Sequence, residues 1–389
     1  MQRAVLSCVL LALGVGLVSA CAKKPAEPDV AIGVVAELSG DIPAVGASCK
    51  QAAEMAVEEI NAAGGIEVAG KRHGLKLVFG DTGGKPEQAV AAAKKLIDGD
   101  KVLALIGPNA SNNAVPVAEV AEAAKILMIS PWSTNPRTTV DASGAPRKFV
   151  FRACFTDAFE GHLLARFAQG YLHSTKAAVL YDADSEAPRS QAELFKKDFE
   201  EDGGKVVAFE TFKAGDKDFA AQLKKIKEAG PEVVFLPSYY NDVPAQLKQA
   251  RELGLTVPFL GSDNWGTPEF IKLSGKDAEG ASFCTHYNAK AKSTVTGTFV
   301  VSYQNRYAKA TPDDVAALTY DAFQLLAKAI GGAASLDRTA VRDAMAKITT
   351  HEGVTGKMTW KPGSGDPVKG AVMQKVENGE FKFITNIDP

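Results

Sequence analysis

The sequence lacks a surplus of either charge: 44 Lys and Arg residues stand against 46 Asp and Glu residues, a formal net charge of −2. Proteins that bind nucleic acid normally carry a basic surplus, so this balance argues against a nucleic-acid partner. After residue 20 the sequence also has no apolar run of 18 residues, so no later membrane-spanning helix is expected. With 46% hydrophobic residues, the 389-residue chain can build the cores of two domains of ordinary size.

Cysteine and histidine are scarce. The chain has five of each, no Cys-x-x-Cys pair and no histidine spacing typical of a zinc site. We therefore expect no metal and no other cofactor. The motifs of phosphate-binding loops, serine hydrolases and zinc proteases are absent or incomplete, which favours a protein that is not an enzyme. An exported α/β hydrolase is a distant alternative.

The first 20 residues differ from the rest of the chain. Arg3 precedes an almost wholly apolar stretch from Ala4 to Val18, and small residues then lead to Cys21. This order is typical of a secretory signal, and the stretch is too short for a comfortable membrane span. The cysteine at its end resembles a bacterial lipoprotein signal. We expect cleavage after residue 20, lipid on Cys21 and a linker over 21–29; the alternative is an uncleaved anchor helix.

Apolar runs of strand length alternate with helical patterns along the rest of the chain. This alternation predicts a parallel sheet with helices on both faces, and it restarts near residue 177, which predicts a second unit. The expected fold is therefore α/β with two doubly wound parallel-sheet lobes. The expected strands are 30–36, 75–79, 102–106, 126–129, 177–181, 206–209, 233–236, 259–260, 357–360, 370–377 and 381–384. The expected helices are 50–63, 86–97, one from 111–113 to about 125, 191–201, 219–228, 243–253, 316–330 and 337–348.

Loops at the carboxyl ends of parallel strands are where ligands bind in open α/β sheets. Residues 107–113 place hydroxyl and amide side chains at the start of a helix, where free N–H groups and the helix dipole favour an anion such as a carboxylate. Residues 130–136, 237–242 and 261–266 present hydroxyls, acids or aromatics at other strand ends. A cleft that gathers these loops suits an amino acid zwitterion. Taken singly, each of these residues is better explained by capping or by packing.

These segments resemble the periplasmic leucine/isoleucine/valine-binding proteins, the amino-acid-binding lipoproteins of ABC importers. The matching segments follow the family's order across nearly all of residues 30–389. They include Glu59-Ile60-Asn61-x-x-Gly64-Gly65-Ile66, Gly107–Ser111, Ile129-Ser130-Pro131-x-Ser133-Thr134-x-Pro136, Phe149–Arg152, Gly261-Ser262-Asp263 and Thr319-Tyr320-Asp321-Ala322. The resemblance implies a type I periplasmic binding protein in which three chain crossings form a hinge. It places lobe 1 at 30–151 and 285–353, and lobe 2 at 152–284 and 354–389.

The resemblance also implies roles for individual residues. Ser111 and the backbone beside it would hold the α-carboxylate of an amino acid. The Trp132 carbonyl and the Thr134 hydroxyl would hold its α-ammonium, opposite the counter-charge of Asp263. Tyr239 would close over the ligand. The full set of expected ligand-binding residues is Asn109, Ser111, Trp132, Ser133, Thr134, Glu186, Tyr239 and Asp263.

Several positions depart from the family pattern. Trp132 stands where a small residue is common, and Glu186-Ala187 stand where Tyr-Gly often lines the pocket. Val45 replaces an aromatic or polar residue, and the first-lobe disulfide of some members is excluded by Gly83 and Ala110. Trp132 could shrink the pocket or stack on a flat ligand, and Glu186 could meet a polar or cationic group or face solvent. Branched-chain specificity is therefore open.

The crossings are expected near Phe151–Cys154, Phe283–Thr285 and Val354–Thr355. Cys154 and Cys284 fall on two of them, so either a disulfide joins these residues or both are separate buried thiols. We expect a periplasmic monomer, tethered to a membrane through Cys21, that binds a branched-chain, other neutral or polar amino acid or a close analogue and delivers it to an ABC permease in the inner membrane. The alternative is a sensor that presents its closed form to a signalling partner.

Overall fold

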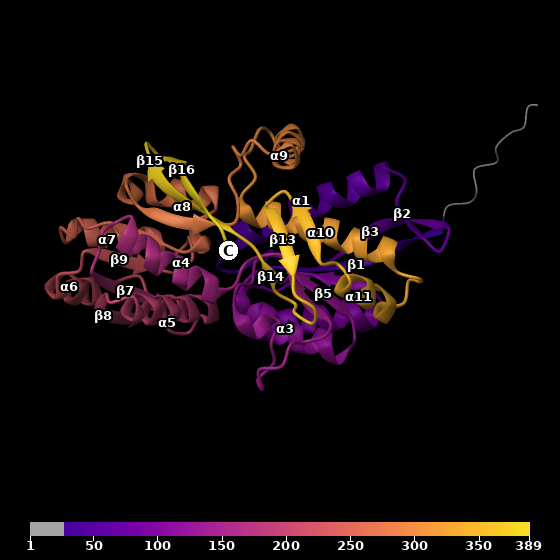
Figure 1. The fold of residues 1–389 in the computed structure, drawn as a ribbon, viewed down its shortest axis with the longest axis horizontal. Helices are drawn as coiled ribbons and strands as arrows, with labels where there is room; N and C mark the ends of the chain where they lie inside the picture. The colour runs from indigo at the N-terminus through magenta and orange to yellow at the C-terminus, as the bar shows by residue number, and fades with distance from the viewer. Residues whose placement is uncertain (1–26) are drawn as a thin grey trace, which may run out of the picture.

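The computed structural model describes residues 27–389, so the expected signal segment and Cys21 lie outside the described residues. The described chain forms two α/β lobes side by side, each built on its own sheet (Figure 1). This architecture confirms the predicted fold class. No helix in residues 27–389 is both long enough and apolar enough to cross a membrane.

The first lobe contains a six-stranded sheet in the order β2-β3-β1-β4-β5-β6. Neighbouring strands are parallel, except that β2 runs antiparallel to β3. The strands are β1 (Glu27–Ala36), β2 (Ile66–Val68), β3 (Lys71–Asp81), β4 (Ala104–Ile106), β5 (Leu127–Ser130) and β6 (Val150–Arg152). The helices are α1 (Pro43–Ala62), α2 (Pro86–Lys94), α3 (Ser111–Ala123), α10 (Asp314–Gly332) and α11 (Arg338–Ala346), with short helical turns at Lys95–Gly99 and Pro136–Thr138.

Continuous burial explains the central strands of this sheet. Side chains of β1 and β4 are apolar on both faces, because α1, α10 and α11 cover one face and α2 and α3 cover the other. Helix α1 begins with Pro43, whose missing N–H costs nothing at the first helical position. The helices hold the carboxyl ends of β1, β4 and β5 in one row, which positions the loops that follow these strands.

The second lobe contains a seven-stranded sheet in the order β16-β15-β11-β10-β9-β7-β8. The strands from β8 to β11 pair in parallel, and β15 and β16 add an antiparallel edge. The strands are β7 (Lys176–Asp182), β8 (Lys205–Phe212), β9 (Val233–Leu236), β10 (Phe259–Gly261), β11 (Ser282–Thr285), β15 (Ala371–Glu377) and β16 (Glu380–Ile387). The helices are α4 (Asp157–Gly170), α5 (Glu186–Glu201), α6 (Ala220–Ala229), α7 (Val243–Glu252) and α8 (Pro268–Ser274), with short turns at Asp263–Trp265 and Gly275–Ala278.

The chain passes from the first sheet to the second after β6 and leaves the second sheet after β11. Helix α9 (Thr294–Arg306) then packs on α1 and α10 of the first lobe. The third crossing differs from its expected place. Val354–Thr355 form the turn of a hairpin between β12 (Thr350–Gly353) and β13 (Gly356–Trp360), and the chain rejoins the second sheet only at β15.

A buried acid on α10 explains this difference. The Asp321 carboxylate accepts hydrogen bonds from the N–H groups of Val354 and Thr355 at 2.7 and 3.0 Å, and from the Thr355 hydroxyl at 2.6 Å. The turn is therefore fixed to the first lobe. Strand β14 (Pro367–Val368) completes a three-stranded sheet with β13 before the chain crosses.

Candidate ligand-binding site

The segments after β4 and β5 bring two predicted hydroxyl groups, those of Ser111 and Ser133, together with the Thr138 hydroxyl, which was not predicted. The Ser111 and Ser133 Oγ atoms lie 2.9 Å apart, and Ser133 Oγ lies 2.7 Å from the Thr138 hydroxyl. The Ser130 hydroxyl donates to the Pro108 carbonyl at 2.8 Å, which ties the two loops together. All of these side chains are buried. The chain of hydroxyls can donate to an anionic group at the carboxyl edge of the sheet.

A buried arginine shapes the second of these loops. The Arg152 guanidinium donates to the Ser133 and Asn135 carbonyls at 2.6 and 2.8 Å and to the Thr139 hydroxyl at 2.8 Å. Its Nε also pairs with Asp366 at 2.7 Å. Because these bonds fix the loop backbone, Ser133 and its neighbours are held in place without a ligand.

The start of helix α3 already holds a carboxyl group that belongs to the protein. The buried Glu37 carboxylate accepts from the Ala110 N–H at 3.1 Å and from the Asn109 and Asn113 amides at 3.1 and 3.0 Å. Burial raises the Glu37 pKa, and these donors oppose the rise. The predicted anion position at this turn is therefore partly filled, and the Asn109 amide donor is engaged by Glu37. Sequence reasoning missed Glu37, although an acid directly after a buried strand was the available signal.

In the second lobe, Asp263 lies in a buried polar network. Its N–H donates to Glu160 at 2.8 Å, the Gln191 amide donates to its Oδ1 at 3.2 Å, and His286 Nε2 lies 3.0 Å from its Oδ2. Burial raises the Asp263 pKa to about 7. Burial and the nearby Asp263 charge also raise the pKa of Glu160 well above its usual value, and the Cys284 thiol donates to that carboxylate at 2.8 Å.

Asp157 is a second acid at this position, and sequence reasoning missed it. Its side chain is fully buried, and neither carboxylate oxygen has a hydrogen-bond partner among the described residues. Its N–H donates to the Thr134 carbonyl at 2.9 Å, which places it beside the predicted ammonium loop. Burial raises the Asp157 pKa to about 7, while the nearby Ser190 and Thr134 hydroxyls oppose the rise. Since an unpaired buried carboxylate is costly, a cation beside Asp157 would stabilise its charged form.

Two aromatic side chains, one from each lobe, lie close to each other near these polar groups. The Trp132 and Tyr239 rings lie 6.1 Å apart at an interplanar angle of 45°. Burial, followed by the charges of Glu37 and Asp263, raises the Tyr239 pKa well above its usual value. The Trp132 indole N–H is buried without a partner among the described residues. The structure thus places Trp132 of the first lobe beside Tyr239 of the second.

Glu186 lies at the start of α5, where this helix contacts the first lobe, and its charge is paired. Its carboxylate is 3.0 Å from Arg189 on the same helix and 3.9 Å from Arg137 of the first lobe. Its backbone also bonds to the side chains of Asn112 and Asn135. These contacts engage both the carboxylate and the backbone of Glu186 within the protein.

The interpretation of Cys154 and Cys284 as a disulfide is contradicted by the structure. Both are free, buried thiols, as is Cys49. The Cys154 thiol donates to the Ser133 carbonyl at 3.2 Å, whereas the Cys284 thiol donates to Glu160. The two side chains therefore contact different partners on either side of the crossing strands.

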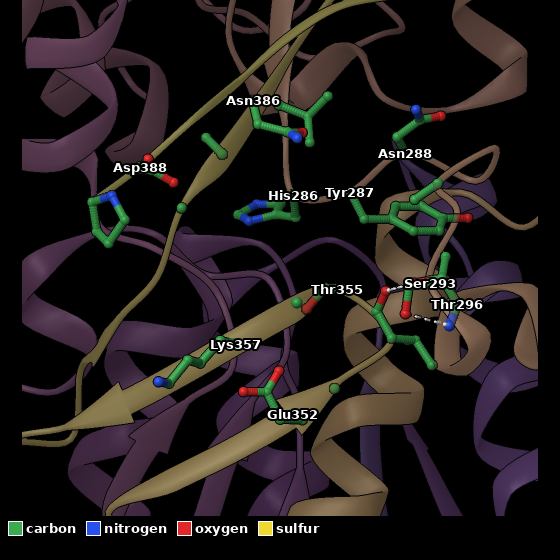
Figure 2. Close-up of a pocket in the computed structure, with 18 of the residues that line it drawn as sticks. His286, Tyr287, Asn288, Ser293, Thr296, Glu352, Thr355, Lys357, Asn386 and Asp388 are labelled. Carbon is green, nitrogen blue, oxygen red and sulfur yellow. Dashed lines mark hydrogen bonds between the residues drawn. The ribbon is translucent and has the colours of Figure 1, made fainter.

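A separate cavity of about 670 Å³ lies behind the hinge. Figure 2 shows His286 and Tyr287 between the β12–β13 hairpin and the C-terminal residues Asn386 and Asp388. None of the predicted ligand-binding residues lines this cavity. Within residues 27–389, no three His, Cys, Asp or Glu side chains form a group that could hold a metal ion.

Comparison with known proteins identifies the family to which this fold belongs. A family model described as periplasmic binding protein matches residues 29–380, and the chain belongs to that family. Among its relatives, Leu/Ile/Val-binding protein homolog 3 of Brucella melitensis is 32% identical over 73% of each chain. An amino acid binding protein of Pseudomonas aeruginosa is 31% identical over 85% of this chain and 86% of its own.

Solved structures with a similar fold include binding proteins of the same kind. The leucine binding protein LivK of Thermotoga maritima has a TM-score of 0.86 at 35% identity and covers 92% of this chain and 99% of its own. LivJ of Streptococcus pneumoniae, solved with isoleucine, has a TM-score of 0.85 at 30% identity. The match covers 93% of this chain and 100% of LivJ. The resemblance to leucine/isoleucine/valine-binding proteins that the sequence predicted is thus confirmed.

Proposed function

We propose that this chain is the solute-binding lipoprotein of an ABC importer and that it binds an amino acid or a close analogue between its lobes. The observation that carries this proposal is the pair of buried acids, Asp157 and Asp263, beside a hydroxyl-bearing loop of the other lobe. Such a cleft has one end that favours a cation and one that can donate to an anion. An amino acid carries an ammonium group and a carboxylate group on the same carbon atom. The names of the relatives support the same ligand class.

The bound zwitterion would use contacts from both lobes. Its ammonium would lie between Asp263, Asp157 and the Thr134 hydroxyl. Its carboxylate would accept from the Ser111 and Ser133 hydroxyls. Each charge-assisted hydrogen bond contributes about 1.5–3 kcal/mol, so a few contacts reach the roughly 8 kcal/mol of micromolar binding. The ligand leaves chemically unchanged, because the cleft only holds and releases it.

Trp132 and Tyr239 would form the wall that the ligand side chain meets. Because both rings are large and buried, they limit the volume available to that side chain. We propose a neutral amino acid, with branched-chain amino acids as the first candidates because two solved relatives are named for leucine binding or contain isoleucine.

Delivery would take place at a membrane. We propose that Cys21 carries a lipid and that the described lobes work as a monomer in the periplasm, tethered close to an inner-membrane permease. The lipoprotein-like signal in the sequence supports this part of the proposal. Labelling with a radioactive fatty acid, lost in Cys21→Ala, tests the anchor directly.

The ligand is tested by a thermal-shift panel of amino acids, amides and small carboxylates, followed by calorimetry. We expect Asp263→Asn and Thr134→Ala each to weaken the best hit by about 10- to 100-fold, because each removes a contact to the ammonium. Asp202→Asn removes a carboxylate from the exposed surface of the same lobe and serves as the control. Unchanged affinity in both site variants would place the ligand elsewhere.

A further inference from the structure

Helix α5 of the second lobe contacts α3 of the first lobe, and Figure 1 shows these two helices near the boundary between the lobes. The first residue of α5, Glu186, has a backbone N–H that no residue of its own helix can accept. The side chain of its N-cap residue, Ser185, makes no capping hydrogen bond, and the Ser185 hydroxyl donates to Asp182. The Asn112 side chain of α3 takes this role, and its Oδ1 accepts from the Glu186 N–H at 2.6 Å. A helix in one lobe is thus capped by a side chain of the other.

A second hydrogen bond crosses between the lobes at the same place. The Asn135 amide donates to the Glu186 carbonyl at 3.3 Å. The rest of Asn135 is already fixed, since its Oδ1 accepts from the Arg137 N–H at 2.9 Å and its carbonyl accepts from the buried Arg152 at 2.8 Å. The first lobe therefore presents one acceptor and one donor in fixed positions to a single residue of α5.

The Glu186 carboxylate adds a weaker contact. It lies 3.0 Å from Arg189 and 3.9 Å from Arg137, whose side chains are 40% and 53% exposed. Water screens such pairs, so they contribute little to closure. The backbone of Glu186, rather than its charge, makes the shorter contact with the first lobe.

We propose that Asn112, Asn135 and the first turn of α5 form a latch that stabilises the closed form, and that Glu186 is a positioning residue within it. This inference rests on the proposed function, in which the ligand is held between closed lobes. The apparent affinity depends on the fraction of molecules that can close, so a latch changes the affinity for every ligand by the same factor. A residue that contacts the ligand side chain instead changes the order in which ligands are preferred.

Asn112→Ala removes the cap and leaves α5 unaltered. We expect the Kd of each ligand to rise by about three- to tenfold, through faster dissociation, with the ligand order unchanged. Arg189→Ala is the matched control, because it removes a partner of Glu186 within the same helix; its Kd should stay within about twofold. A changed ligand order, or an unchanged Kd, in Asn112→Ala would overturn the latch.

Glu186→Pro removes the backbone N–H that donates to Asn112. Proline suits the first position of a helix, and Ser185 already has the extended backbone that a following proline requires, with φ −94° and ψ 128°. Glu186→Ala keeps the N–H and isolates the loss of the carboxylate, so its effect should be small. In the Glu186→Pro background, Asn112→Ala should have no further effect on Kd. Fully additive effects would contradict a shared hydrogen bond.

The distance between the lobes supplies a measurement that needs no knowledge of the ligand. Labels on cysteines introduced at the exposed positions Lys94 and Lys224 report closure, because the three native cysteines of the described chain are buried. Asn112→Ala should shift the distances toward the open form. If no amino acid binds, the proposed function fails while this shift still reports the latch. If amino acids bind and the distances stay unchanged, the latch alone fails.

Discussion

At the scale of single residues, two buried acids of the second lobe, Asp157 and Asp263, would determine what the proposed site can hold. Asp157 and Asp263 both have a pKa of about 7, and burial is the main cause in each. His286, which contacts Asp263, has its pKa held well below the usual value by burial, so it supplies no charge near neutral pH. The nearby Arg152 is engaged by carbonyl groups and Asp366. A cationic ligand therefore finds little competition for these carboxylates.

Ligand affinity should consequently depend on pH. Below about pH 7 a bound ammonium must displace protons from Asp157 and Asp263, so affinity should rise between pH 5.5 and 8, by up to about tenfold per pH unit for each proton released. Calorimetry in buffers of different ionisation enthalpy measures this proton release. An affinity that is constant over this range would show that neither acid meets the ligand.

The stability of the ligand-free protein should change in the opposite direction. The native state holds these protons up to about pH 7, whereas the unfolded chain releases them near pH 4. Because the native state binds more protons between these values, the ligand-free protein should lose stability as pH rises from 4 to 7. Melting temperatures with and without ligand should therefore diverge with pH.

At the scale of elements, the sequence predicts those strands and helices whose buried apolar residues follow a regular pattern. The apolar strands and the helices with a clear apolar face were identified, because their periodicity comes from the core that they fill. Helix α4 was missed, since its first turn buries Asp157 and Glu160 and so hides the apolar pattern. Asp157 and Glu160 lie near Asp263 only because the fold brings together segments that are about 100 residues apart in the chain. Ser111 and Thr134 were predictable from their loops, whereas the acids beside them depend on contacts far apart in the chain.

The packing of α1 on β1 gives a test at this scale. A Cβ atom added at Gly46 would lie 2.1 Å from the Glu37 carbonyl oxygen, so α1 or β1 must move. We expect Gly46→Ala to destabilise the protein by about 1–3 kcal/mol in chemical denaturation. Gly297→Ala, also within a helix, meets nothing within 4 Å and should stabilise it by about 0.5–1 kcal/mol. Equal effects of the two substitutions would show that the close approach of α1 to the Glu37 backbone does not limit the side chain at position 46.

At the scale of the whole molecule, the thiols report the integrity of both lobes. Burial raises the pKa of Cys49 to about 11 and that of Cys154 to about 12, and it also raises the pKa of Cys284 well above its usual value. A thiol reagent at pH 8 should therefore leave native protein unlabelled. In denaturant, mass spectrometry should find three labels within residues 27–389, without prior reduction. A single label would indicate that two of these cysteines are paired after all.

The order of the segments along the chain has a consequence for how this protein is made. All strands of the first sheet lie before residue 153, yet α10, which packs on α1, begins only at Asp314. A ribosome therefore releases β1 to β6 long before the helix that shields one face of their sheet. During that interval an unfinished hydrophobic surface is exposed, so nascent chains stopped before Asp314 should need a chaperone to stay in solution, even when the second sheet's parallel strands are already synthesised.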